Sequence, residues 1–193
     1  MGTSGSEGGP GKPTSRKADR APRSDPYTYV PTWDGTVYVA FVVDVFSRMI
    51  VGWRAATKMT TPLVLDALEM ALWSRRKHGV TDLSGLVHHT DAGSQYTSIA
   101  FTQRLVAEGV DPSVGSVGDA YDNTLAESHM GLYKSELIHP YGPWTDREHV
   151  ELDTLDWVHW FNTARPHESI DDLTPEQVEQ LHYTHRTRLA ETG

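Results

Sequence analysis

Hydrophobic and polar residues alternate through the segment that begins near residue 27, which is the pattern of half-buried β-strands. We expect strands at residues 27–30, 37–45 and 49–53. The dipeptide Asp34-Gly35 separates the first two strands and favours a tight hairpin turn, because glycine accepts a positive φ angle. The pattern therefore predicts a meander of three antiparallel strands.

A longer, helical period follows the meander. Pro62 opens a predicted helix whose apolar residues recur at every third or fourth position, and Gly79 ends it. The remaining elements are predicted in the order strand, helix, strand, helix and helix, at residues 86–90, 99–108, 113–114, 119–138 and 148–161. This order indicates an α/β fold with a mixed sheet of five strands flanked by helices.

Composition narrows the class of protein. The chain has 193 residues, of which 38% are hydrophobic, and this is enough for one domain with a single core. The absence of cysteine excludes disulfides and cysteine-ligated zinc, and it is compatible with a reducing cytoplasm. No apolar run is long enough to span a bilayer. We therefore expect a cytoplasmic protein with no membrane association.

Four parts are expected along the chain. Residues 1–24 are rich in Gly, Pro and Ser and should form a disordered basic tail, residues 25–140 the folded core, residues 141–180 a helical extension of that core, and residues 181–193 a flexible tail. A basic arm that contacts phosphates is the alternative for the first part, which has more Lys and Arg than Asp and Glu. The whole chain carries a formal charge of −9. Such a core would bind nucleic acid weakly unless cations neutralise its acids and another module or subunit supplies positive charge.

Two acidic residues stand out by their context. Asp91 directly follows the predicted strand at residues 86–90, and Glu127 lies about one helical turn after Asn123 in the predicted helix at residues 119–138. Either acid alone is compatible with a turn residue or a solvated surface group. Together, an acid at a strand end and an acid on a helix can meet at one cluster of divalent cations, which prefer oxygen ligands.

The spacing of these acids belongs to a wider match. Four stretches resemble, in order and spacing, the integrase catalytic core of insertion-sequence transposases related to retroviral integrases, which use a D,D(35)E triad. The stretches are residues 39–53, the segment around Asp91, residues 121–137, and residues 160–167 together with Leu173-Thr174-Pro175. The resemblance covers residues 29–177 and implies an RNase H-like fold.

This resemblance also implies an activity and a set of partners. The family cuts and joins DNA strands at element ends and target sites, with two Mg²⁺ or Mn²⁺ ions, as a homo-oligomer in a synaptic complex. Asp91 and Glu127 would be catalytic and would bind the metal ions. Lys134 would contact the DNA backbone near the cleaved end, and Asn123 would contact the terminal nucleotides. From the residues alone, Lys134 could equally be a surface lysine and Asn123 a helix-capping residue.

Neighbouring polar residues are expected to support the structure. His88 and His89 precede Asp91, but alternate side chains of a strand point to opposite faces, so at most one of them could face the site. We expect a packed or supporting role for it. Asp44 lies in the predicted second strand, where the family carries an acid that is not a principal metal ligand, and we expect it to be structural.

The first acid of the triad departs from the family pattern of Asp, any residue, Thr and Tyr. Aligning Thr28-Tyr29 with its end places Pro26 at the position of the acid and Asp25 one residue early. Either a bulge near Pro26 brings Asp25 to the metal ions, or the triad is incomplete and activity is impaired. The corresponding alternative function is a catalytically silent transposase remnant that binds DNA or oligomerises.

Two further expectations concern the region upstream of the core and the class of enzyme. The family normally carries a helix-turn-helix region upstream of the catalytic core, so the resemblance suggests an N-terminally truncated product. A stand-alone RNase H-like nuclease is the remaining alternative, but residues 160–175 match the transposase pattern.

Overall fold

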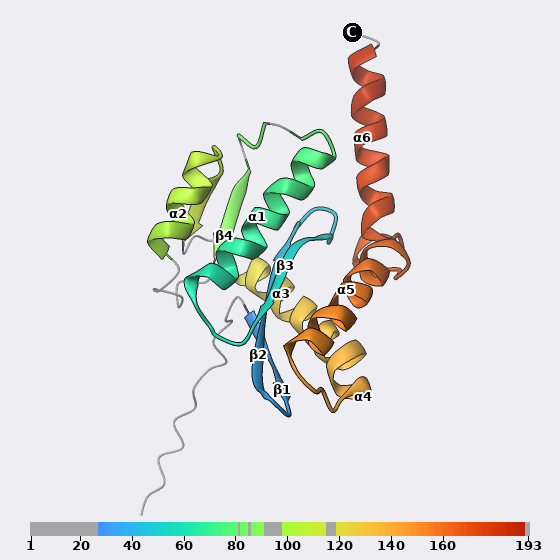
Figure 1. Ribbon diagram of the computed structural model, residues 1–193. Helices are drawn as coiled ribbons and strands as arrows, with labels where there is room; N and C mark the ends of the chain where they lie inside the picture. The colour runs from blue at the N-terminus through green and yellow to red at the C-terminus, as the bar shows by residue number, and fades with distance from the viewer. Residues whose placement is uncertain (1–26, 81, 85, 91–97, 115–118, 192–193) are drawn as a thin grey trace, which may run out of the picture.

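The computed structural model describes residues 27–80, 82–84, 86–90, 98–114 and 119–191 (Figure 1). Its elements are β1 (Tyr27–Thr32), β2 (Gly35–Val43), β3 (Ile50–Ala56), α1 (Thr61–Lys77), β4 (Val87–Thr90), α2 (Ser98–Ala107), β5 (Asp111–Val114), α3 (Asp119–Tyr133), the π-helical turn η1 (Lys134–Ile138), α4 (His139–Tyr141), α5 (Arg147–Thr163), the 3₁₀ turn η2 (Glu168–Ile170) and α6 (Pro175–Glu191). The predicted strands and helices are all present, with ends shifted by a few residues. The predicted tail at residues 1–24 and Asp25 lie outside the described residues.

The five strands form two hydrogen-bonded parts within the described residues. β1, β2 and β3 make an antiparallel sheet in that order, and β4 and β5 make a parallel pair. Gly35, which opens β2 after the predicted turn, has a φ angle of 125°, a value that a residue with a side chain rarely adopts. The mixed strand directions agree with the prediction. The predicted single sheet of five strands is divided, among the described residues, into a three-stranded and a two-stranded part. Alternation identifies strands and does not identify their partners.

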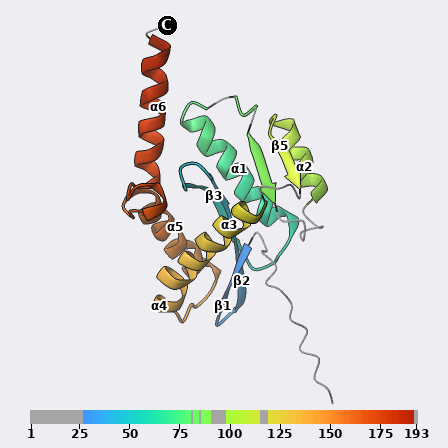
Figure 2. The same ribbon diagram turned by 180° about the vertical axis from the view of Figure 1, so that it is seen from behind.

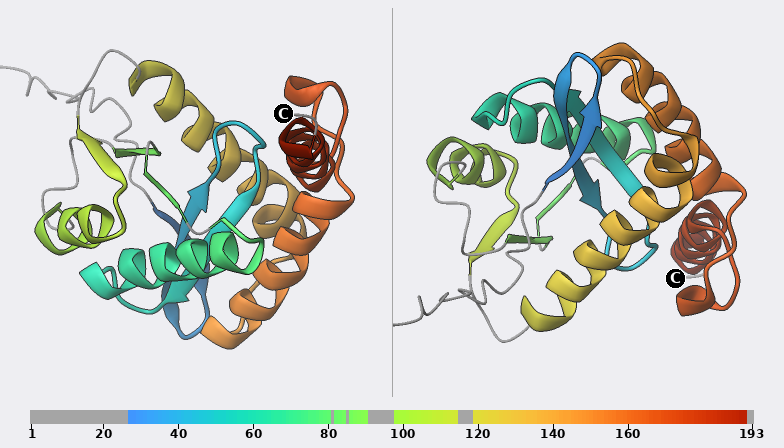
Figure 3. Two further views of the ribbon diagram at one scale, coloured as in Figure 1. Left: turned by 90° about the horizontal axis from the view of Figure 1, so that it is seen from above. Right: turned by 90° about the horizontal axis from the view of Figure 1, so that it is seen from below.

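Helices cover both faces of the three-stranded sheet (Figure 3). On one face, Ala40 of β2 packs with Leu63 and Ala67 of α1. On the other face, the neighbouring residue Val39 belongs to a larger cluster with residues of α3, η1 and α5, namely Tyr133, Leu137, Ile138, Val150, Trp157, Val158 and Phe161. Successive side chains of one strand therefore serve two cores, as the period of two requires.

A second apolar cluster joins α1 to the two-stranded part. Leu68 and Leu72 of α1 pack with Phe101 and Leu105 of α2, and Val110 before β5 completes the contact. Because α1 also contacts β2 and β3, this helix lies between the three-stranded sheet and α2, which in turn contacts β5. The burial of these side chains holds β4 and β5 beside the meander without a continuous backbone ladder.

The helical segment predicted at residues 119–138 is confirmed, with one local difference. α3 passes at Tyr133 into η1, where the backbone N–H of His139 donates to the oxygen of Lys134, five residues earlier. A π-helical turn of this kind adds a residue to the turn and shifts the side chains that follow it. α5 then begins at Asp146, whose side chain accepts a hydrogen bond of 2.9 Å from the backbone N–H of His149 and so caps the helix.

α6 extends into the segment for which the sequence pattern predicts a flexible tail, residues 181–193. The helix continues to Glu191 and projects away from the rest of the molecule (Figure 1). No Gly or Pro interrupts the segment between residues 181 and 191, so no residue in it breaks the helix. Within the described residues, no helix is long and apolar enough to cross a membrane.

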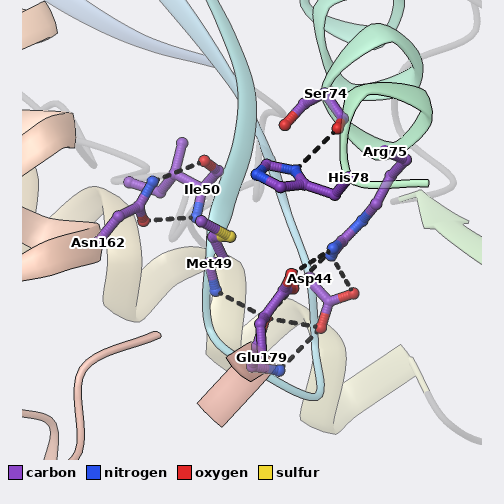
Figure 4. Close-up of polar contacts among 9 residues, drawn as sticks. Asp44, Met49, Ile50, Ser74, Arg75, His78, Asn162 and Glu179 are labelled. Atoms are coloured by element: carbon purple, nitrogen blue, oxygen red, sulfur yellow. Dashed lines mark hydrogen bonds and ion pairs between the residues drawn. The ribbon is translucent and has the colours of Figure 1, made fainter. Parts of the chain in front are cut away.

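A cluster of ionic and polar side chains fixes the base of α6 (Figure 4). Arg75 of α1 donates to Glu179 of α6 and to Asp44, the residue after β2. Ser47, in the turn between β2 and β3, donates through its hydroxyl group to both carboxylates, at 3.1 Å from Asp44 and 2.8 Å from Glu179. Asp44 therefore has the structural role expected for it.

Candidate active site

Glu127 lies on the exposed side of α3. The buried side of this helix carries His129 and Tyr133, four residues apart, and Glu127 is about 200° around the helix from His129 at 100° per residue. Glu127 makes no ion pair with a described residue. Among the described residues, its side chain is exposed to solvent.

His129 fixes the middle of α3 against the turn between β2 and β3. Its Nδ1 lies 2.9 Å from the oxygen of Leu125, and its Nε2 lies 3.3 Å from the oxygen of Arg48. Arg48 occupies the left-handed region with a φ angle of 66°, which directs its backbone within the turn. Burial lowers the pKa of His129, because the surrounding protein disfavours the charged imidazolium.

Tyr133 fixes the end of α3 against α5. Its hydroxyl oxygen lies 2.7 Å from Oγ1 of Thr154, and both groups are buried. Burial raises the pKa of Tyr133, so the neutral phenol is the stable form. With His129, this bond defines the rotation of α3 and so the direction in which Glu127 faces.

The strand that precedes Asp91 in the sequence, β4, lies beside α3. α3 contacts β4, and Figure 2 shows these two elements close together. Asp91 is bonded to Thr90, the last residue of β4, but Asp91 itself lies outside the described residues. The structure therefore brings together the elements that carry or precede the two acids, and the meeting of their carboxylates stays a prediction.

Lys134 lies two helical turns beyond Glu127, at the start of η1, and about 10 Å along the helix axis. Its Nζ lies 5.0 Å from the centroid of the Tyr29 ring on β1, a cation–π geometry. Asn123 lies on α3 one turn before Glu127, and its side chain is outside the described part of the structure. The common helix face expected for Asn123, Glu127 and Lys134 can therefore be described only for Glu127 and Lys134.

The described residues contain only part of the candidate metal site, because Asp91 and Asp25 lie outside them. Among them, no group of three or more His, Asp or Glu side chains is arranged to hold a metal ion. The open carboxylate of Glu127 supplies the oxygen ligands that Mg²⁺ and Mn²⁺ prefer, and Asp91 and Asp25 would supply the same chemistry. The donor set therefore fits a hard divalent cation.

His88 packs against α2. Its ring centroid lies 5.0 Å from that of Phe101, with the rings nearly edge to face. This contact gives His88 the packed role expected for it, while the side chain of His89 lies outside the described residues.

The sequence analysis missed two aromatic residues beside Lys134. Tyr29 and Trp33 are 62% and 77% exposed and line one groove with Lys134. The strand pattern contained part of the signal, because Thr28 and Val30 are buried and the residue between them must face the other side. The residue that faces Tyr29 across the groove depends on tertiary packing, which a strand pattern does not contain.

Known families and proteins are similar to this chain over most of its length. A family model described as the integrase core domain matches residues 24–120, and another with the same description matches residues 108–175. A protein assigned to insertion sequence element IS986/IS6110 of Mycobacterium tuberculosis (strain ATCC 25618 / H37Rv) is 53% identical over 163 residues, which are 84% of this chain and 59% of the relative. The transposase for insertion sequence element IS629 of Shigella sonnei is 52% identical over 157 residues, which are 81% of this chain and 51% of the relative. The chain thus spans little more than half the length of these relatives.

Solved structures with low sequence identity share the fold. The HTLV-2 integrase catalytic core domain in complex with magnesium, in its trimeric form, aligns with a TM-score of 0.53 and 17% identity over 79% of this chain and 90% of that one. A chain of the simian T-cell lymphotropic virus intasome aligns with a TM-score of 0.57 and 16% identity, over 79% of this chain and 51% of that one. These likenesses confirm the RNase H-like α/β fold expected from the sequence.

Proposed function

Because the chain belongs to the integrase core domain family, we propose that it is the catalytic core of an insertion-sequence transposase that cuts and joins DNA strands with divalent metal ions. The observation that carries the proposal is the placement of Glu127. This carboxylate faces outward from α3, which contacts the strand that immediately precedes Asp91. A helical acid and an acid after a strand end would then share one edge of the fold.

Asp91 and Glu127 would hold two Mg²⁺ or Mn²⁺ ions through their carboxylate oxygens. The bound ions would activate an attacking water or 3′-hydroxyl group and stabilise charge on the leaving oxygen. His129 and Tyr133 keep Glu127 in its outward direction. Lys134 would neutralise a phosphate of the DNA backbone, and Asn123 would donate hydrogen bonds to terminal nucleotides.

DNA strand cleavage and transfer test this function. Purified protein would be incubated with labelled linear DNA and Mg²⁺ or Mn²⁺, and then with EDTA. We expect metal-dependent nicking and joined products for the wild-type chain, with activity reduced by at least about a hundredfold in Asp91→Asn and Glu127→Gln. Asp156→Asn and Glu148→Gln are matched controls, because both acids are exposed on α5. Unchanged activity in either site variant removes that residue from the mechanism.

The first acid has a separate test. If Asp25 supplies the missing ligand, Asp25→Asn abolishes metal-dependent activity. If the triad is incomplete, the wild-type chain is inactive and Pro26→Asp restores activity, since it places an acid at the family position. A silent remnant is indicated when neither the wild-type chain nor Pro26→Asp cleaves DNA. Hydrolysis of RNA–DNA hybrids in preference to DNA strand transfer would indicate the nuclease alternative.

The same activity calls for a homo-oligomer, and α5 offers a surface for it. Leu152 and Leu155 are 64% and 51% exposed and lie three residues apart on one side of this helix. Exposed apolar side chains that neighbour one another favour a protein interface. We expect Leu155→Glu to lower the molar mass measured by light scattering, and an unchanged mass would place the interface elsewhere.

A further inference from the structure

A groove about 440 Å³ in volume lies beside Lys134, lined by residues of β1, the β1–β2 turn, η1 and the segment before α5. The residues that shape it are Tyr29, Pro31, Trp33, Lys134, Ile138 and Trp144. We call it the Trp33–Lys134 groove. Its volume lies within the range of small-ligand sites, and two large aromatic rings at its margin are mostly exposed to solvent.

The groove is built on fixed backbone. The N–H of Trp33 donates to the oxygen of Trp144 at 2.9 Å, and the N–H of Asp34 donates to the oxygen of Thr145 at 3.2 Å. The buried indole Nε1 of Trp144 in turn donates to the oxygen of Ile138 at 3.2 Å. These bonds tie the tip of the β1–β2 hairpin to η1 and to the segment before α5. The walls of the groove are therefore held in place without a ligand.

Charge distinguishes this groove from the rest of the chain. Lys134 holds its ammonium group over the Tyr29 ring, and none of the described residues that line the groove is acidic. The chain as a whole carries a formal charge of −9. The additional residue in the η1 turn also lets His139 line the groove together with Lys134. A groove with a cation, no acid and exposed aromatic faces is complementary to a ligand that has both an anionic group and a flat ring.

Position relates the groove to the proposed chemistry. Lys134 and Glu127 share one helix and are separated by about 10 Å along its axis. Tyr29 lies on β1, and Trp33 follows about 13 Å further along the direction of that strand. A DNA strand that reaches Glu127 can therefore continue along the helix into the groove.

We propose that the Trp33–Lys134 groove binds an unpaired nucleotide of the DNA substrate close to the reacting end. The base stacks on the exposed ring of Trp33, and Lys134 donates to a phosphate of the same strand. Every base has a flat π face, so the contact accepts any base and selects a single strand over a paired duplex. This inference rests on the proposed function and adds to it a site for single-stranded DNA.

Binding in the absence of metal tests the site independently of catalysis. The full chain would be titrated against a fluorescein-labelled single-stranded oligonucleotide in EDTA at low salt, with fluorescence anisotropy as the readout. We expect Trp33→Ala and Lys134→Ala each to weaken binding about tenfold. The Lys134→Ala variant should also lower the slope of log affinity against log salt by about 0.7, the value for one phosphate of a single strand.

The chain supplies a matched control pair. Lys77 holds its Nζ 5.1 Å from the centroid of the Trp73 ring on α1, and Trp73 is 60% exposed. Trp73→Ala and Lys77→Ala therefore remove the same chemistry from a surface outside the groove, and we expect binding within about twofold of wild type. An abasic oligonucleotide adds a second arm, because loss of the stacked base should weaken wild-type binding and have no further effect in Trp33→Ala.

Each outcome has a defined consequence. The inference is overturned if the wild-type chain does not bind the oligonucleotide, or if the groove variants and the control variants bind alike. It is also overturned if Trp33→Ala changes the sedimentation of the protein and leaves DNA binding intact, since a second copy would then occupy the groove. Asp156→Asn, on the exposed surface of α5, should bind the oligonucleotide as wild type does. Binding through the groove without any cleavage would contradict the proposed function and leave the groove as a DNA site.

Discussion

Nη1 of Arg75 on α1 lies 2.7 Å from both carboxylate oxygens of Glu179 on α6. Nη2 of the same guanidinium lies 2.7 Å from Asp44, at the end of β2. The Arg75 and Glu179 side chains are only 11% and 12% exposed, so solvent screens their attraction weakly. One arginine therefore joins three elements that are distant in the sequence, and it positions the base of the projecting helix α6.

We expect Arg75→Met to destabilise the protein at this junction. The variant leaves Asp44 and Glu179 close together without their cation, and we expect the free energy of unfolding to fall by about 3 kcal/mol. Urea unfolding followed by circular dichroism measures the change. The control is Arg147→Ala, because Arg147 is 40% exposed and its contact with Glu151 is 3.5 Å long, so its loss should cost less than about 1 kcal/mol. Equal effects in the two variants would contradict a special role for Arg75.

We expect Gly52→Ala to disturb the close packing of α1 on β3. A Cβ atom at Gly52 would lie 2.2 Å from the backbone oxygen of Ala67 and 2.7 Å from the backbone nitrogen of Ala71, and neither atom can move without the helix. We expect a loss of about 3 kcal/mol or more in unfolding free energy.

The matched control for this substitution is Gly131→Ala. Gly131 lies in α3, and an added Cβ would have nothing within 4 Å. Alanine has the higher helix propensity, so we expect a gain of about 0.5–1 kcal/mol. Thermal unfolding of both variants should therefore shift in opposite directions, and a tolerated Gly52→Ala would mean that α1 packs less closely on β3 than described.

His167 should make the stability of the fold depend on pH. Nη1 of Arg165 donates to Nδ1 of His167, which requires the neutral ring, and Nε2 of His167 donates to the oxygen of Phe161. Burial, the main cause, lowers the pKa of His167 below its ordinary value of 6.5. The unfolded chain therefore takes up a proton more readily, so this contribution is present above pH 6.5 and is lost as the pH falls below it.

The variant His167→Gln isolates this contribution. We expect the difference in unfolding free energy between wild type and His167→Gln to be larger at about pH 7.5 than at about pH 5.5, because glutamine does not titrate. Urea unfolding at the two pH values measures the difference. A difference that stays constant or widens as the pH falls would show that His167 is not held neutral in the folded state.

Local sequence signals predicted the elements of this fold well. The hairpin at Asp34-Gly35 and the helix between Pro62 and Gly79 rest on the conformational limits of Gly and Pro, which act within a few residues. The outward position of Glu127 is likewise consistent with the helical period. Such features depend on short stretches of chain and can be derived from them.

Features that depend on distant partners were not predicted. The division of the strands into two hydrogen-bonded parts and the ionic junction at Arg75 join residues far apart in the sequence. The π-helical turn at Lys134 breaks the period of 3.6 on which helix prediction relies. The groove beside it needs both that turn and the hairpin tip at Trp33, so periodicity alone could not reveal it.

The central claim is that the carboxylates of Asp91 and Glu127 share divalent cations, and Mn²⁺ binding measured by electron paramagnetic resonance tests it most directly. We expect Asp91→Asn and Glu127→Gln each to weaken Mn²⁺ binding by at least about tenfold, and the loss in the double variant to depart from the product of the two single losses. Asp156→Asn and Glu148→Gln, on the exposed surface of α5, should bind Mn²⁺ as wild type does. Additive losses in the double variant, or wild-type affinity in Glu127→Gln, would contradict a shared cation.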